Sequence, residues 1–199
     1  GTIGSSTFQN FERVIGTDGN DVFVSDGVTE IDGGDGIDTV DFSQLDQGVN
    51  INLLQQGADI DFGIGIGIAV EVAAAAEGPL EAEIAPEQIT VNNVQNVENV
   101  IGTEFDDDIR SNNGDNTLRG LGGDDFLSGR GGRDVLIGGK GDDEVRGRNG
   151  NDLMIWNNGD GSDLFNGGQG DDTVEVNFNP DLVNDDLQND DTARITDSP

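Results

Sequence analysis

Aspartate recurs every nine residues in the C-terminal half of the chain, always two positions before an apolar residue. The segment from Gly120 to Arg146 reads GLGGDDFLS, GRGGRDVLI and GGKGDDEVR when it is divided into nonapeptides. Each nonapeptide offers a carboxylate and several backbone carbonyls, which are hard oxygen ligands. Calcium suits such ligands because it accepts roughly six to eight oxygens in irregular geometry, whereas magnesium demands a strict octahedron. The spacing therefore predicts a series of calcium sites.

The nonapeptide occurs eight times between residues 102 and 175, with a two-residue insertion at Trp156 and Asn157. Position eight is apolar in every repeat, which is not a chance pattern. Position six supplies the candidate ligand in each repeat, and its residues are Asp107, Asn116, Asp125, Asp134, Asp143, Asp152, Asp163 and Asp172.

A second, shorter array lies near the N-terminus. GTDGNDVFV and GGDGIDTVD fit the same template and add Asp21 and Asp38 as candidate ligands. The segments that precede the two arrays, QNFERVIGT and QNVENVIGT, agree at seven of nine positions. The chain therefore contains two related modules of different length.

The glycine-rich start of each repeat and its apolar end predict a turn followed by a short strand. Glycine at positions one, two and four permits positive φ angles and close backbone approach, so six residues can form a tight turn. The last three residues, with one apolar side chain, suffice for a very short strand. Two repeats then make one coil of a flattened solenoid, whose apolar residues meet in a thin core.

These patterns divide the chain into four parts. Residues 1–57 hold the short array with its lead-in and a flanking strand, predicted from the alternating sequence GVNINLL. Residues 58–94 form an insert, in which GIGIGIAVEV predicts a strand and the alanine-rich remainder a loop or short helix. Residues 95–175 hold the main array, and residues 176–199 form an acidic tail without repeats.

Composition excludes several classes of protein. The chain has 199 residues, 41 acidic and 9 basic, for a formal charge of −32, and it lacks cysteine and histidine. Disulfides, thiolate zinc sites and histidine-based catalytic triads are therefore excluded. The most apolar segment, Phe62 to Ala76, is too short to cross a bilayer and contains Glu71. Nucleic acid is not expected as a partner, because phosphate neutralisation requires basic patches.

The repeats GGKGDDEVR, GGQGDDTVE, NGDGSDLFN and GGDGIDTVD resemble the template GGxGxDxUx of the RTX, or hemolysin-type, calcium-binding family. The resemblance implies an all-β fold, a right-handed parallel β-roll with two repeat arrays separated by a strand-containing insert. It also implies that each calcium lies between turns two repeats apart on one edge. One edge would pair Asp107 with Asp125, Asp125 with Asp143, and Asp143 with Asp163; the other would pair Asn116 with Asp134, Asp134 with Asp152, and Asp152 with Asp172.

The resemblance assigns the remaining calcium ligands to backbone carbonyls of the turns. About six to eight calcium ions are expected in total. The candidate glycines are Gly120, Gly122, Gly129, Gly131, Gly138, Gly139, Gly141, Gly147, Gly150, Gly159, Gly161, Gly167, Gly168 and Gly170.

The function implied is that of a calcium-binding β-roll module in a secreted or cell-surface protein. It would be exported by type I secretion machinery and would fold on binding calcium outside the cell. The opening GTIGSS contains no signal peptide, which favours a fragment or a processed product. An accessory module of a secreted polysaccharide-processing or hydrolytic enzyme, and an adhesin or envelope protein that contacts a cell surface or polysaccharide, are the alternatives. Catalysis within the chain is not expected, because nearly all regularly placed Asp residues are committed to turns.

Overall fold

The computed structural model describes residues 13–27, 30–53, 88–91, 94–157, 159–177 and 193–196. These residues form strands and turns, with no helix among them. Within the same ranges, nothing helical is long and apolar enough to cross a membrane. The strand predicted at residues 63–72 and the alanine-rich segment after it lie outside the described residues.

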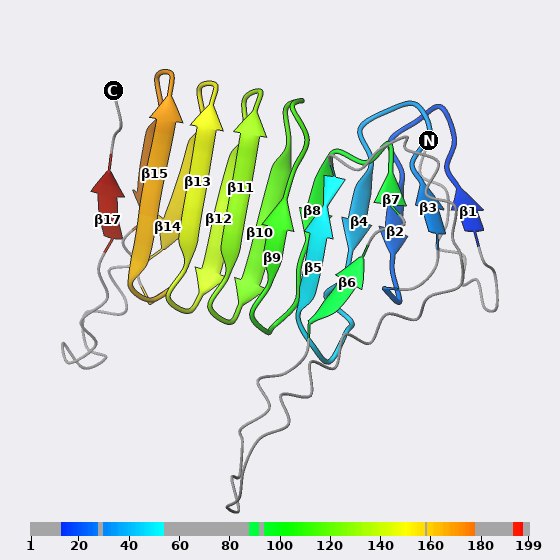
Figure 1. Ribbon diagram of the computed structural model, residues 1–199, viewed down its shortest axis with the longest axis horizontal. Helices are drawn as coiled ribbons and strands as arrows, with labels where there is room; N and C mark the ends of the chain where they lie inside the picture. Colours follow the sequence, from blue (N-terminus) through cyan, green and yellow to red (C-terminus); the bar gives the residue numbers. More distant parts are fainter. Residues whose placement is uncertain are drawn as a thin grey trace, which may run out of the picture.

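Two seven-stranded parallel sheets make up most of the fold and face each other across the core (Figure 1). The first sheet contains, in spatial order, β2 (Val22–Val24), β4 (Thr39–Asp41), β8 (Asn99–Ile101), β10 (Thr117–Gly122), β12 (Val135–Lys140), β14 (Leu153–Asn157) and β16 (Thr173–Asn177). The second contains β6 (Ile89–Val91), β5 (Val49–Asn52), β9 (Asp108–Arg110), β11 (Phe126–Gly131), β13 (Glu144–Asn149), β15 (Asp163–Gln169) and β17 (Ala193–Thr196). A small third sheet joins β1 (Arg13–Ile15), β3 (Glu30–Asp32) and β7 (Val94–Gln95).

Strand pairing follows the predicted two-repeat period. Leu118 pairs with Leu136 in the first sheet, and Leu127 pairs with Val145 in the second. Each coil thus contains two repeats, of which one forms a strand in the first sheet and the next forms a strand in the second. The following coil stacks on it in parallel. The prediction of an all-β parallel β-solenoid built from two repeats per coil is confirmed.

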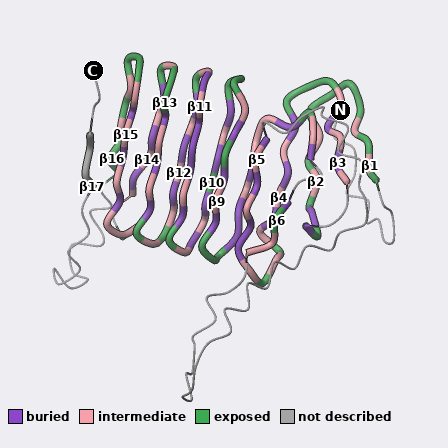
Figure 2. The backbone as a smooth tube through the Cα atoms, viewed as in Figure 1, coloured by how far each residue is buried: buried purple, intermediate pink, exposed green. Residues whose placement is uncertain are grey.

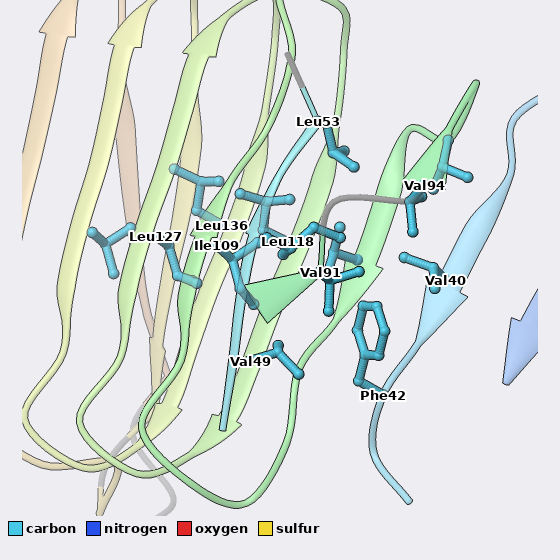
Figure 3. Close-up of a cluster of buried hydrophobic side chains, with 14 of the residues drawn as sticks. Val40, Phe42, Val49, Leu53, Val91, Val94, Ile109, Leu118, Leu127 and Leu136 are labelled. Carbon is cyan, nitrogen blue, oxygen red and sulfur yellow. The ribbon is translucent and has the colours of Figure 1, made fainter. Parts of the chain in front are cut away.

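The core is the stack of position-eight side chains between the two sheets (Figure 3). Ile109, Leu118, Leu127, Leu136 and Val145 are fully buried. Buried and partly exposed residues alternate along most strands, because successive side chains point to opposite faces (Figure 2). The thin apolar core predicted from position eight is therefore present.

The two arrays form one continuous solenoid although the insert separates them in sequence. Strand β4 pairs with β8, and β5 pairs with β9, so the coil before the insert stacks on the coil after it. In this pairing Val40 lies beside Val100. The strand predicted in GVNINLL is β5, and its side chains alternate between buried and partly exposed, as expected.

Two features of the C-terminal part were not visible in the repeat pattern. Trp156, in the two-residue insertion, is only 4 % exposed, lies on β14 and belongs to the apolar core. The acidic tail, for which the sequence indicated no strand, contains β17, which pairs with β15. The insertion therefore adds a large side chain to the core, and the tail adds a strand to the end of the second sheet.

Candidate calcium sites

The position-six residues form two columns, one along the start of the strands in each sheet. In the second sheet, the Oδ1 atoms of Asp125, Asp143 and Asp163 accept hydrogen bonds from backbone N–H groups two repeats earlier, at N···O distances of 2.8, 2.9 and 3.0 Å. In the first sheet, Asp134, Asp152 and Asp172 do the same at 2.8, 2.9 and 2.9 Å. The donors are the N–H groups of their predicted partners, so the structure brings all six predicted pairs together, including the two that span the insertion.

The short array continues the column of the first sheet. The Asp21 N–H donates to Asp38 Oδ1 at 2.8 Å. The Asp38 N–H donates in turn to Glu98 Oε2 at 2.8 Å. Glu98 therefore occupies a position-six place that the sequence analysis missed. Its spacing was the available signal, because Glu98 lies two repeats before Asn116.

Six position-six residues carry a buried carboxylate oxygen without a hydrogen-bond partner. The atom is Oδ2 in Asp38, Asp125, Asp134, Asp143, Asp152 and Asp172. An ionised carboxylate that is buried without compensation costs several kcal/mol. A hard divalent cation would relieve this cost, so the donor set fits calcium.

Glycine at position one leaves room beside these oxygens. A Cβ on Gly120 would overlap Asp125 Oδ2 and lie 2.5 Å from the Gly138 carbonyl oxygen. The carboxylate and the carbonyl of the next coil thus converge on space that only glycine leaves open. The glycines with positive φ stand instead at positions two and four, as Gly139 (120°) and Gly141 (128°) illustrate.

Burial shapes the electrostatics of both columns. Desolvation raises the pKa of Asp125 to about 9, and the neighbouring carboxylates of Asp107 and Asp143 raise it further. Desolvation also raises the pKa of Asp134 and Asp163 to about 7, and that of Asp143 to about 6. Without a cation, the folded columns therefore favour the protonated carboxyl groups.

Asp107 and Asp21 differ from the six residues with an unpartnered Oδ2, because threonine groups already donate hydrogen bonds to that atom or to both carboxylate oxygens. The Thr103 N–H donates to Asp107 Oδ2 at 2.7 Å, and its hydroxyl donates to Oδ1 at 3.0 Å. In the short array, the N–H and hydroxyl of Thr17 donate to Asp21 Oδ2 at 2.7 and 2.9 Å. The sequence analysis treated all position-six Asp residues alike; threonine in place of glycine at position two was the distinguishing signal.

Asn116 bridges two coils through its amide group. Its Nδ2 donates to the Glu98 carbonyl at 2.7 Å, whereas its Oδ1 is buried without a partner. A neutral amide can link the coils in this way without a metal. Its predicted role as a calcium ligand would use Oδ1 alone.

Position five forms a second ladder that the sequence analysis also missed. Asp106 and Asp124 each accept a hydrogen bond from the position-five N–H two repeats later, at 2.8 and 2.9 Å. The Ser162 N–H donates to Asp142 in the same manner at 2.9 Å. These side chains are exposed, in contrast to the buried position-six carboxylates beside them.

Each turn brings one buried carboxylate and backbone carbonyls to its edge, rather than several acidic side chains. Accordingly, the described ranges contain no group of three or more His, Cys, Asp or Glu residues arranged to hold a metal. The assignment of the predicted Asp, Asn and Gly residues as calcium ligands stays a prediction.

The raised pKa values predict that acid stabilises the metal-free fold. The folded-state pKa values of Asp125, Asp134 and Asp163 exceed the ordinary value of 3.8, so stability is fully present below about pH 4. It is lost as the pH rises through about 7 to 9. In excess chelator, we expect the β-sheet signal in circular dichroism to increase when the pH falls from 8 to 5.

The matched pair Asp125→Asn and Asp124→Asn tests the cause of this pH effect. Asp125→Asn removes the buried charge and should increase the metal-free β-sheet signal at pH 8. Asp124→Asn removes an exposed charge and should change the signal less. Equal responses of the two variants would attribute the pH effect to net charge and contradict the role of burial.

Comparison with known proteins agrees with this geometry. The sequence model of the family described as RTX calcium-binding nonapeptide repeat matches residues 101–136, 128–155 and 158–178. A search of curated proteins gave no match. Proteins with this repeat are typically secreted. The matched segment contains five of the six unpartnered carboxylates, and the two sheets that it helps to build are parallel. Residues 101–178 of this chain are therefore RTX calcium-binding nonapeptide repeats, folded as a β-roll.

Proposed function

We propose that this chain is a calcium-dependent structural module of a secreted or cell-surface protein. The observation that carries the proposal is the set of six buried, unpartnered Asp oxygens in a chain with a formal charge of −32. The folded state places like charges in columns, and cations must neutralise them before the coils can stack. Calcium binding and folding are therefore one process for this chain.

Side chains and backbone would supply different ligands to calcium. Position-six carboxylates such as Asp143 supply the negative charge, and the carbonyls of the glycine turns complete the oxygen ligands. When bound, calcium supplies the positive charge that cancels repulsion between neighbouring turns. In the stacked coils, the hydrogen bond from each N–H to the Oδ1 two repeats later fixes the orientation of the carboxylate.

The calcium concentration would decide where the module folds. Extracellular calcium sites have dissociation constants of roughly 10⁻⁴ to 10⁻³ M, far above the calcium level of a cytosol. The chain would stay unfolded inside the cell, in a form suited to export by type I secretion machinery, and would fold outside. We assign no catalytic step to this chain, because its buried carboxylates are engaged in the turns.

Counting bound calcium tests the proposal. We expect about six ions per chain at saturation, one for each unpartnered Oδ2 atom, measured by elemental analysis after equilibrium dialysis. Asp125→Asn should lower the count and raise the calcium concentration needed for folding. Asp124→Asn, which changes the adjacent exposed residue, should leave the count unchanged.

Two outcomes would contradict the proposal. A parent chain that folds with fewer than about three calcium ions would leave most of the buried carboxylates unexplained. An equal loss of calcium in the two variants would show that position six has no special role.

A further inference from the structure

Basic residues gather on the outer face of the second sheet. The chain has nine Lys and Arg residues, and four of them lie on β9, β11 and β13. These strands are neighbours in the sheet. The four residues, called here the arginine patch, are Arg110, Arg130, Arg146 and Arg148.

Two members of the arginine patch are paired within the protein. Arg110 forms an ion pair with Asp108 at 2.7 Å, and Arg146 forms one with Glu144. The two guanidinium groups also lie over the ring of Phe126, each 5.1 Å from its centroid. Their charges are thus compensated and their positions fixed.

The other two members form no ion pair with an acidic side chain among the described residues, although the Asp108 carboxylate lies near enough to Arg130 to attract its charge. Arg130 and Arg148 are register partners on adjacent strands, so two like charges lie side by side. Arg148 Nε donates to Ser128 Oγ at 2.9 Å, and Arg130 Nη1 is buried without a partner. Burial lowers the pKa of Arg130, and Arg110 and Arg148 lower it further. An anion beside the two guanidinium groups would therefore reduce the repulsion between them.

The backbone at both residues is strained. Arg130 and Arg148 have φ angles of 65° and 80°, in the left-handed region where a side chain costs energy. Gly139 and Gly168 occupy the same position of other repeats with positive φ. The repeat therefore favours glycine here, but Leu121 has a φ of 91° at the same position, so the strain belongs to the repeat and does not by itself mark a ligand site.

An open groove beside the arginine patch provides room for a ligand. Its volume is about 290 Å³. Its lining combines cationic and amide side chains, which are Arg146, Arg148, Asn149, Asn166 and Gln169, with the backbone of Gly168. Amide groups donate and accept hydrogen bonds, as sugar hydroxyls do.

We propose that Arg130 and Arg148 bind a carboxylate group of an acidic polysaccharide. A guanidinium fork matches a carboxylate through two parallel hydrogen bonds, and two forks side by side suit one anionic group. The surrounding net charge of −32 repels densely charged polymers such as nucleic acids. The net charge repels an acidic polysaccharide less strongly, because neutral, hydroxyl-rich units separate the charges of such a chain. The amide-lined groove fits these units.

The test uses the calcium-saturated chain and a hyaluronan oligosaccharide, which carries one carboxylate per disaccharide. Titration calorimetry should detect binding that weakens as salt increases. The same oligosaccharide with its carboxyl groups reduced to alcohols should bind about tenfold more weakly or not at all. Arg130→Gly and Arg148→Gly should each lower the affinity for the acidic oligosaccharide about tenfold. Arg133→Gln, which removes an exposed turn charge outside the patch, should leave it unchanged.

Folding provides a second measurement that separates ligand binding from a structural role. If the two arginines only stabilised the fold, their replacement by glycine would raise the calcium concentration needed for folding. Glycine relieves the backbone strain, so both glycine variants should fold at the same or lower calcium concentration than the parent. Equal binding by the parent and the two glycine variants would overturn the proposal, as would equal affinity for the acidic and reduced oligosaccharides. Absence of any binding to the parent chain would also overturn it.

Discussion

Removal of calcium at neutral pH is expected to unfold the β-roll completely. The two columns hold buried carboxylates with raised pKa values, so at neutral pH these groups ionise more readily in the unfolded chain, and the ionised columns of the fold repel one another. Strands of two to seven residues and a thin apolar core cannot offset this repulsion. Circular dichroism should show a disordered chain in excess chelator, and small-angle scattering should show its expansion.

Millimolar calcium should restore the sheet spectrum and the compact radius. Magnesium at the same concentration is the matched control, and it should restore much less because it demands octahedral geometry and retains its waters. The chain should be dialysed exhaustively against chelator before the measurement, so that slowly released calcium is removed. A sheet spectrum that persists after this treatment would contradict calcium-dependent folding.

A substitution in the middle of a column should weaken folding more than one at its end. Asp143 accepts a hydrogen bond from the Asp125 N–H and donates its own N–H to Asp163, so it links three coils. Asp172 accepts from the Asp152 N–H in the last repeat of its column. Asp143→Ala removes a charge-assisted hydrogen bond, worth about 1.5–3 kcal/mol, together with the ligand that two calcium ions are expected to share.

Calcium titrations followed by circular dichroism distinguish the two variants. Asp143→Ala should raise the calcium midpoint for folding of residues 102–175 and reduce the cooperativity of the transition. Asp172→Ala should change both quantities less, because a stack of repeats frays at its end but is divided by damage in its middle. Ionic strength must be constant so that screening is equal. A larger effect of Asp172→Ala would indicate that folding starts at the C-terminal end and would contradict the shared-ligand arrangement.

The repeat pattern predicted most of the fold because its two signals act locally. Position eight is apolar in every repeat, and Leu118, Leu127 and Leu136 are buried for that reason. Position six follows a glycine turn in nearly every repeat, which places Asp125 beside Asp143 once the coils stack. A strict period fixes the neighbours of each residue without further information.

Features outside the period left weaker signals in the sequence, or none. Whether Asp107 needs a cation depends on Thr103 and on the N–H of Val49, which arrives from a strand far away in sequence. Glu98 replaces Asp in a turn that lacks the glycine template, so only its spacing connects it to the column. Strand β17 pairs with the end of the solenoid from within an acidic segment that has no repeat. Such contacts arise from tertiary stacking rather than from local sequence.

The pairing of β5 with β6 marks a place in the solenoid where an insertion can be accommodated. Residues 54–87 separate β5 from its neighbour β6 in the sequence, and the two strands pair with Val49 beside Ile89. The coils on either side stack through β4 with β8 and β5 with β9, so their contacts do not depend on the length of this segment. Doubling the length of a flexible connection costs only about 0.6 kcal/mol. A whole domain inserted there would be attached to the solenoid without interrupting the contacts between its coils. The module can therefore evolve a new surface without changing its repeats.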